Sequence, residues 1–277
     1  MMEPLLLREI IKSFLIEDLG SGDITSASIF SPEQAGQAVF VAKETMVTAG
    51  MESVAAQVFK LINPQIACQA ISDGQTITAG QTVLEVTGPI LDLLKAERVA
   101  LNLVQRLCGI ATLTAEFVQQ VKDLPIKIVD TRKTTPGLRI LEKYAVRVGG
   151  GHNHRFSLSD GILIKDNHIA AAGSIKEAVN KVKNVAPHTI RIEVEAEKIE
   201  QVEECLTCNV DAILLDNMSC SALRQAVNMA KGKVLLEASG GINLDNVRMI
   251  AETGVDIISV GALTHSAPAC DISMRMS

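Results

Sequence analysis

Residues 131–168 concentrate positive charge in a chain that is acidic overall. The segment holds seven lysines and arginines against three acids, whereas the whole chain has a formal net charge of −6. Three of the five histidines also lie there. Guanidinium and ammonium groups donate charge-assisted hydrogen bonds to carboxylates and phosphates, so we expect a pocket for a multiply charged anion. The basic residues are Arg132, Lys133, Arg139, Lys143, Arg147, Arg155 and Lys165.

Within this segment, GGGHNHR at 149–155 suggests a phosphate loop, a metal site or a pocket for another anion. No GK[ST] follows the glycines, as a nucleotide phosphate loop requires. His152 and His154 have no third metal ligand close by in the sequence. We therefore expect the glycines to let the backbone approach a pocket, where His154 and Arg155 face a carboxylate. His152 is expected to make a supporting hydrogen bond.

Acidic side chains lie in the apolar runs that follow. In TIRIEVEA, alternation places Glu193 and Glu195 on one face with Arg191, opposite two apolar residues. Charge on the inner face of a barrel is costly unless it is paired. Glu193 could belong to an internal salt-bridge network. Glu195 and Asp216, nearer the strand ends, could instead hold hydroxyl groups or a divalent metal.

Two glycine-rich loops, SGGI at 239–242 and SVGAL at 259–263, follow the last apolar runs. Such loops after late barrel strands present backbone N–H groups to phosphates. The alternative is a purely structural role in tight loops.

The elements that must position these residues repeat regularly. Apolar runs separated by helical or loop segments indicate a parallel sheet, either a barrel or an open doubly wound sheet. No GxGxxG follows a first strand, which disfavours a dinucleotide-binding sheet. The six expected strands are 126–132, 161–167, 189–196, 212–217, 234–240 and 256–262. A seventh could be hidden.

The N-terminal part has a different pattern of apolar and polar residues. We expect helices at 4–19, 50–62 and 91–122, the last interrupted near Gly109, and a strand at 37–43. The segment 66–90 has short alternating strands between turn signals, which predicts a small β sandwich. It resembles a lipoyl carrier module faintly, but its turns SDGQ and TAGQ lack the lysine that attachment needs. A helix over LRILEKYAV should place Lys143 and Arg147 on a solvated face.

Composition excludes several function classes. Hydrophobic residues make up 47% of the 277 residues and aromatics only 3%, so the core is aliphatic and base stacking has little to use. The acidic balance argues against nucleic-acid binding. No signal peptide or long uncharged apolar run is present, so we expect a cytoplasmic protein that does not bind membranes. The CxxC at Cys205 and Cys208 lacks the further ligands of a zinc site.

The stretch DTRKTTPGLRILEKYAVRVGGGHNHRFSLSDGILIKDNHI closely resembles the signature of the quinolinate phosphoribosyltransferase family. ERVALNLVQRLCGIAT, RIEVEAE, ILLDNMS, EASGGI and DIISVGALTHSAPACDIS match as well, so the resemblance covers essentially the whole chain. It implies an α/β fold with an incomplete α/β barrel of about seven strands at 106–264. An N-terminal α/β sandwich domain at 1–105 would be joined by the C-terminal tail 265–277.

The resemblance also implies an enzyme, a glycosyltransferase of de novo NAD biosynthesis. It would convert quinolinate and phosphoribosyl pyrophosphate (PRPP) to nicotinate mononucleotide, CO2 and pyrophosphate, with Mg2+. A homodimer or higher oligomer is implied, with Arg98 reaching the partner subunit's site. A paralogue on the same scaffold, such as a molybdenum-associated protein acting on another aromatic acid, is the alternative.

Motif by motif, the implied site residues fall into three groups. Those for quinolinate are Arg98, Arg132, His154, Arg155 and Lys165. Those for PRPP and the metal are Lys133, Glu195 and Asp216, with Asp166 as a further candidate. Thr131 is expected to bind substrate as well. Those for the 5′-phosphate are Ser239, Gly240, Gly241, Val260, Gly261 and Ala262. Catalysis is expected to depend on Lys133, Lys165, Glu195 and Asp216, with Glu195 and Asp216 as the metal ligands. Either Lys165 or His154 could pass a proton to the intermediate.

Overall fold

The chain forms two compact units in a computed structural model that describes residues 3–230 and 232–276. The first unit comprises the described residues up to Ala115, Thr135–Gly150 and those from Ser266 onwards. The second comprises Glu116–Thr134 and Gly151–His265. No helix in the described ranges combines the length and the apolar character needed to cross a membrane.

These units differ from the predicted bounds at both ends of the barrel, since residues 106–115 lie in the first unit and His265 lies in the second, and at one internal segment. We expected residues 135–150 in the barrel, but they group with the first unit. Helix α5 (Arg139–Val148) supplies the reason. Its buried Glu142 pairs with Arg106 at 2.6 Å, and Tyr144 donates a hydrogen bond to Asp73.

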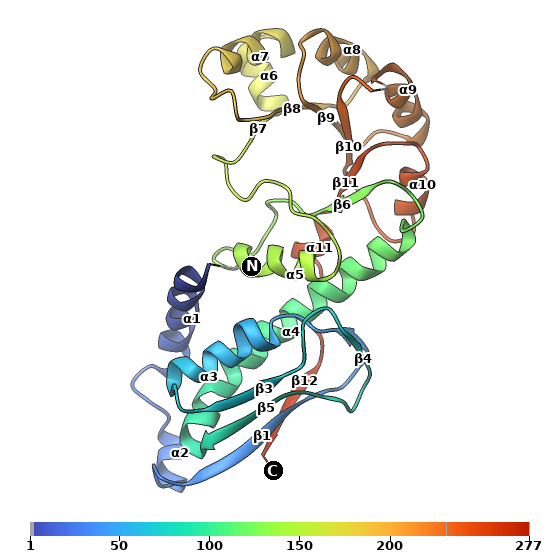
Figure 1. Cartoon of the computed structure of the whole chain (residues 1–277). Helices are drawn as coiled ribbons and strands as arrows, with labels where there is room; N and C mark the ends of the chain where they lie inside the picture. The colour runs from blue at the N-terminus through green and yellow to red at the C-terminus, as the bar shows by residue number, and fades with distance from the viewer. Residues whose placement is uncertain (1–2, 231, 277) are drawn as a thin grey trace. The chain divides into compact units, whose positions relative to one another are not determined.

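The first unit is built on an antiparallel sheet with the order β12-β1-β5-β3. Figure 1 shows these strands in the lower part of the view. Phe40 of β1 packs edge-on against Phe59 of α3, with ring centroids 5.8 Å apart. The strands are β1 (Ala35–Ala42), β3 (Ala67–Ala70), β5 (Thr82–Pro89) and β12 (Ile272–Met276), with a separate pair β2 (Met46–Val47) and β4 (Thr76–Ile77). The helices are α1 (Pro4–Leu19), α2 (Ile24–Ile29), η1 (Met51–Ala55) and α3 (Ala56–Ile62).

The segment 66–90 does not form a sandwich of its own, contrary to our prediction. Its strands β3 and β5 share one sheet with β1, and the C-terminal strand β12 completes the sheet beside β1. Alternation within the segment identified the strands correctly. Their partners lie far away in the sequence, which alternation does not reveal.

Helix α4 (Ile90–Gln120) runs without the interruption we expected at Gly109. A Cβ atom at Gly109 would lie 1.9 Å from the backbone oxygen of Pro268. The glycine therefore serves close packing of the C-terminal segment against the helix. It does not mark a helix end.

We predict that Gly109→Ala destabilises the protein by about 2 kcal/mol, because the overlap outweighs the gain in helix propensity. The measurement is the urea midpoint. Gly161→Ala is the control, since no atom lies within 4 Å of a Cβ there. Equal midpoints for the Gly109 variant and the natural chain would contradict this packing.

The prediction that Lys143 is solvated is wrong. Lys143 and its neighbour Glu142 are fully buried, whereas Arg147 is exposed as expected. Glu142 accepts hydrogen bonds from Arg106 at 2.7 Å and from the backbone N–H of Thr135 at 3.1 Å. Helical spacing finds the two faces of α5, but other segments decide which face is covered.

The second unit contains a parallel sheet of six strands with the order β6-β11-β10-β9-β8-β7. All six expected strands are present, with shorter bounds. They are β6 (Lys127–Val129), β7 (Ile162–Ile164), β8 (Ile192–Ala196), β9 (Ala212–Asp216), β10 (Leu235–Ser239) and β11 (Ile257–Ser259).

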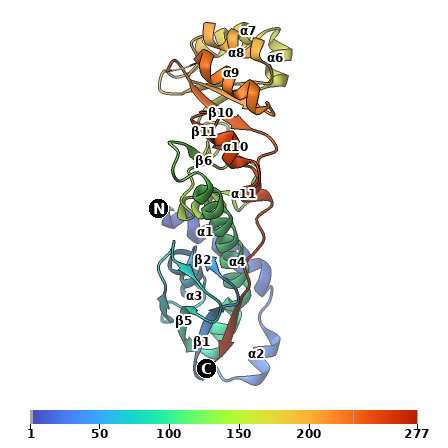
Figure 2. The ribbon, with the colours of Figure 1, turned by 90° about the vertical axis from the view of Figure 1, so that its right-hand side faces the viewer.

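Helices alternate with these strands along the chain and lie outside the curved sheet (Figure 1). Figure 2 shows α8 and α9 side by side, as their contacts require. The helices are α6 (Asp166–Ala172), α7 (Ile175–Lys183), α8 (Ile199–Thr207), α9 (Cys220–Ala230), α10 (Val247–Ala251) and α11 (Ala262–His265).

A seventh parallel segment lies beside β6. His152 forms a parallel bridge with Val129; its N–H donates to Ile128 at 2.8 Å and its carbonyl accepts from Asp130 at 3.1 Å. Six strands and this bridge have the order of an α/β barrel left open between His152 and β7. The hydrogen bonds expected of His152 are therefore made by its backbone.

Candidate active site

One face of the parallel sheet carries the polar residues that the sequence singled out. Strand register pairs Glu195 with Leu214, Leu214 with Glu237, and Asp216 with Ser239. Residues paired in this way project to the same side of a sheet. The face that alternation in TIRIEVEA predicted to be charged is thus continued across β9 and β10.

A cavity of about 550 Å³ opens on this face, at the carboxyl ends of the strands. It gathers fourteen of the fifteen predicted site residues from strands and loops far apart in the sequence. These are Thr131, Arg132, Lys133, His154, Arg155, Lys165, Glu195, Asp216, Ser239, Gly240, Gly241, Val260, Gly261 and Ala262. Arg98 is exposed on α4 in the first unit, and Asp166 does not line the cavity.

A second cavity, of about 680 Å³, lies at the opposite ends of the strands. Arg191 lines it together with Asp211 and Asp256. Both acids accept backbone N–H groups, at Ile192 and Leu236, each at 2.8 Å. Because these carboxylates cap strand starts, we assign them structural roles and place the candidate site at the carboxyl ends.

The basic side of the site is crowded with like charge. Arg155 donates from Nη1 to the carbonyl of Gly161 at 2.8 Å. Burial lowers the pKa of Arg155, and the nearby charge of Arg132 acts in the same direction. An anion bound between the two guanidinium groups would offset this repulsion.

The opposite side of the cavity carries a lysine–carboxylate pair. Lys165 Nζ lies 2.9 Å from Glu195 Oε2. The lysine is half exposed and Glu195 is buried, so the lysine is the partner that can turn toward a ligand. Asp216 lies on the neighbouring strand and accepts a hydrogen bond from Asn217 Nδ2 at 2.8 Å.

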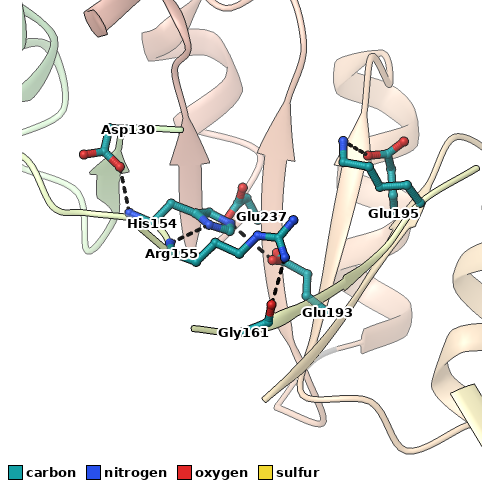
Figure 3. A network of polar contacts seen from close by, with 8 residues as sticks. Asp130, His154, Arg155, Gly161, Glu193, Glu195 and Glu237 are labelled. Carbon is teal, nitrogen blue, oxygen red and sulfur yellow. Dashed lines mark hydrogen bonds and ion pairs between the residues drawn. The ribbon is translucent and has the colours of Figure 1, made fainter. Parts of the chain in front are cut away.

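The histidine segment is held by a buried acid (Figure 3). Asp130 accepts the backbone N–H of His154 at 2.9 Å and the Asn153 side chain at 2.6 Å. The His154 ring reaches two carboxylates, with Nε2 at 3.2 Å from Glu193 Oε2 and 3.6 Å from Glu237 Oε2. Glu193 was considered for an internal salt-bridge network, and the side chain that it meets in the cavity wall is the His154 ring.

The two late glycine loops allow close backbone approach. Gly240 and Gly241 have φ of 92° and 61°, which favour glycine. A Cβ at Gly240 would lie 2.2 Å from Asn217 Oδ1, so the glycine makes room for the side chain that orients Asp216. At Gly261, a Cβ would lie 3.1 Å from the Lys133 side chain.

Among the described residues, three side chains are close enough together to share a metal ion: His154, Glu193 and Glu237. His154 is poorly suited to this role, because its Nδ1 accepts the Arg155 N–H at 2.8 Å and Nε2 must therefore carry the proton. Glu195 and Asp216 project into the same cavity from adjacent strands. Paired carboxylates of this kind fit Mg2+, which takes few protein ligands together with substrate oxygens.

Sequence reasoning omitted several cavity residues. Glu237 is the most consequential, and period-two alternation in VLLEASG could have placed it on the face of Ser239. His265 also lines the cavity, with the apolar Leu163 and Leu214, whereas Ser259 and Ile242 belong to the two glycine-rich loops that the sequence singled out. No local signal separates these apolar residues from the rest of the core.

Two family models match the chain. The quinolinate phosphoribosyl transferase N-terminal domain matches residues 23–108, and the C-terminal domain of the same family matches residues 110–275. The chain is 48% identical over 279 residues to a probable nicotinate-nucleotide pyrophosphorylase (carboxylating) of Bacillus subtilis, covering 100% of this chain and 95% of the relative. It is 39% identical to a quinolinate phosphoribosyltransferase (decarboxylating) of Nicotiana tabacum, covering 98% and 82%.

Solved structures agree with these relatives. NadC from Streptococcus pyogenes superposes with a TM-score of 0.96 at 42% identity, covering 100% of this chain and 98% of the other. The nicotinate-nucleotide pyrophosphorylase from Francisella tularensis superposes with a TM-score of 0.94 at 37% identity, with the same coverage. Sequence and fold thus agree over the whole length, and the chain belongs to the quinolinate phosphoribosyl transferase family.

Proposed function

We propose that this chain transfers the phosphoribosyl group of PRPP to quinolinate with decarboxylation, giving nicotinate mononucleotide, CO2 and pyrophosphate in NAD biosynthesis. The observation that carries the proposal is the cavity itself. It combines Arg132, Arg155 and Lys165 with carboxylates and two glycine-rich loops. The names of relatives that match over nearly the whole chain support the same reaction.

Quinolinate has two adjacent carboxylates on a pyridine ring. Arginine forks bind carboxylates through paired hydrogen bonds, so Arg132 and Arg155 suit this substrate. The arginines would hold the ring with its nitrogen toward the ribose of PRPP. Binding both substrates in one cavity supplies much of the acceleration, because the reacting atoms are brought together.

Displacement of pyrophosphate by the ring nitrogen passes through a transition state with positive charge on the ribose. Glu195 and Asp216 would stabilise this charge through the ribose hydroxyls. Lys133 would neutralise the leaving pyrophosphate, and the loops at Ser239–Gly241 and Val260–Ala262 would hold the 5′-phosphate. Mg2+ held near Glu195 and Asp216 would add further neutralisation of the pyrophosphate.

The test is release of labelled CO2 from carboxyl-labelled quinolinate with PRPP and Mg2+, with nicotinate mononucleotide identified as the product. Omission of PRPP or of Mg2+ should abolish release. Turnover of nicotinate without any turnover of quinolinate would overturn the proposal and point to a paralogue acting on another aromatic acid.

We also propose a homodimer in which Arg98 of one subunit completes the site of the other. Arg98→Ala and Arg155→Ala chains should each be inactive alone. After mixing and refolding, roughly a quarter of natural activity should return, because half of the dimers are mixed and each has one intact site. The control is a chain that carries both Arg98→Ala and Arg155→Ala. It leaves no intact site when mixed with either single variant. Failure of the two single variants to complement would contradict a shared site.

A further inference from the structure

Glu237 is a buried acid in the wall of the candidate active site. It is 3% exposed and lines the cavity from β10. Its Oε2 faces His154, whereas its Oε1 makes no hydrogen bond of normal geometry within the described residues. An ionised carboxylate with one oxygen buried and unsatisfied is costly, so the geometry favours the protonated form.

The tautomer of His154 defines what its ring can do (Figure 3). Its Nδ1 accepts the backbone N–H of Arg155 at 2.8 Å, from which we infer that Nδ1 carries no proton. The ring is therefore neutral, with its single proton on Nε2, which points at Glu193 and Glu237. Loss of that proton would leave an imidazolate anion. His154 can donate a hydrogen bond, but it is not a source of a transferable proton.

Two carboxyl groups face this one N–H, and within the described residues Glu193 is the one that interacts with a cation. Glu193 is nearer to His154 Nε2, and its charge interacts favourably with Arg155. The groups facing Glu237 are Glu193 from β8, His154, and Ser259 from β11. Burial raises the pKa of Glu237 to about 7, and the charge of Glu193 adds to the rise. A hydrogen bond with Ser259 opposes the rise, and His154 would oppose it only with a positive charge on its ring, which the neutral tautomer lacks. The proton of the cluster is thus placed on Glu237.

We propose that Glu237 is the general acid that protonates the ring carbanion left when CO2 departs. This inference rests on the proposed function. The bond between ring carbon C2 and its carboxylate breaks, CO2 leaves, and the electron pair remains on C2 beside the cationic nitrogen. The proton then passes from the Glu237 carboxyl to C2, forming the C–H bond of nicotinate mononucleotide.

The surrounding residues fit this step. The new Glu237 carboxylate accepts the Nε2–H of His154, so His154 acts as a positioning residue that stabilises the product state. Glu237 regains its proton from water when the product leaves. Lys165, the other candidate donor, is paired with Glu195 at 2.9 Å. Its positive charge is needed to hold the substrate anion.

The test compares Glu237→Gln with the natural chain. Glutamine has nearly the same shape and keeps an oxygen that can face His154 Nε2, which lies 3.6 Å from Glu237 Oε2, but it has no transferable proton. We expect kcat to fall by about 10²–10³-fold, the range for loss of a general acid. KM for both substrates should change by less than about threefold. Glu203→Gln, on the exposed face of α8, is the matched control and should keep natural activity.

The pH profile provides a second measurement. The acid form of Glu237 is the active one, so kcat/KM of the natural chain should fall as pH rises through about 7. The Glu237→Gln variant should lack this alkaline decline. Glu237→Asp keeps an acid and should keep both the decline and more activity than the glutamine variant.

The outcomes separate this inference from the proposed function. No CO2 release by the natural chain overturns the proposed function, and the inference with it. Turnover by the natural chain, with Glu237→Gln equally active and equally dependent on pH, overturns the inference alone. If Glu237→Asp and Glu237→Gln bind both substrates yet are equally inactive, Glu237 serves packing and the inference is also overturned.

Discussion

Arg155→Ala should weaken quinolinate binding by about 10²–10³-fold, equivalent to the loss of one buried partner of a charged ligand. Arg155 is held by its Nη1 bond to Gly161, and burial and Arg132 both lower its pKa. The guanidinium is thus oriented, and it lies near the like charge of Arg132, before substrate arrives. The rest of the fork is available to a carboxylate. Titration calorimetry with quinolinate alone measures this effect directly.

The fold should survive this change. Arg155 contributes one side-chain hydrogen bond to the loop, and its removal also removes the repulsion between its charge and that of Arg132. Arg224→Ala, at an exposed position of α9, is the control for loss of an arginine elsewhere in the same unit. Unchanged quinolinate affinity in the Arg155 variant, with circular dichroism as in the natural chain, would remove Arg155 from the site.

Asp216→Asn and Glu195→Gln should each lower kcat by about 10²-fold or more while quinolinate affinity stays within about threefold. Both side chains enter the cavity from adjacent strands, and glutamine in place of Glu195 keeps an oxygen for Lys165, the quinolinate residue that Glu195 contacts at 2.9 Å. Their carboxylates would act on the PRPP side, where charge develops in the transition state. Steady-state kinetics with each substrate varied in turn separates the two effects.

The same variants test the metal assignment. Each should raise the Mg2+ concentration required for half-maximal activity by about tenfold or more, because a carboxylate near the ion is lost. Asp245→Asn, at an exposed position before α10, is the control. An unchanged Mg2+ requirement in both variants would mean that the ion is held by the substrates or by other residues.

Much of the site could be predicted from the sequence because strand geometry is local. Successive side chains of a strand alternate between faces, so Glu193 and Glu195 were placed together on a charged inner face before the structure was known. The carboxyl ends of parallel strands meet at one edge, which brings Asp216 and the two glycine loops to one cavity. The match to family motifs supplied the roles proposed for these residues.

Other predictions failed where distant segments decide the outcome. Lys143 has the spacing of a solvated helical position, but neighbouring elements of the first unit cover it completely. The sequence pattern predicted a helix break at Gly109. The glycine is there because the backbone of Pro268 approaches the helix closely. Local propensity carries no information about which chain segment will lie against a given face.

The sequence by itself determined most of the elements and the charged inner face, since these follow from periodicity and alternation, and its family motifs supplied most of the residues that line the cavity. Only the tertiary structure decided the tautomer and the protonation of the side chains in the cavity. It placed the His154 ring between Glu193 and Glu237, directed the Arg155 N–H to Nδ1, and buried Glu237 with one oxygen unsatisfied. Tautomer and protonation depend on atoms a few ångströms away, and residues brought together from different strands provide those atoms.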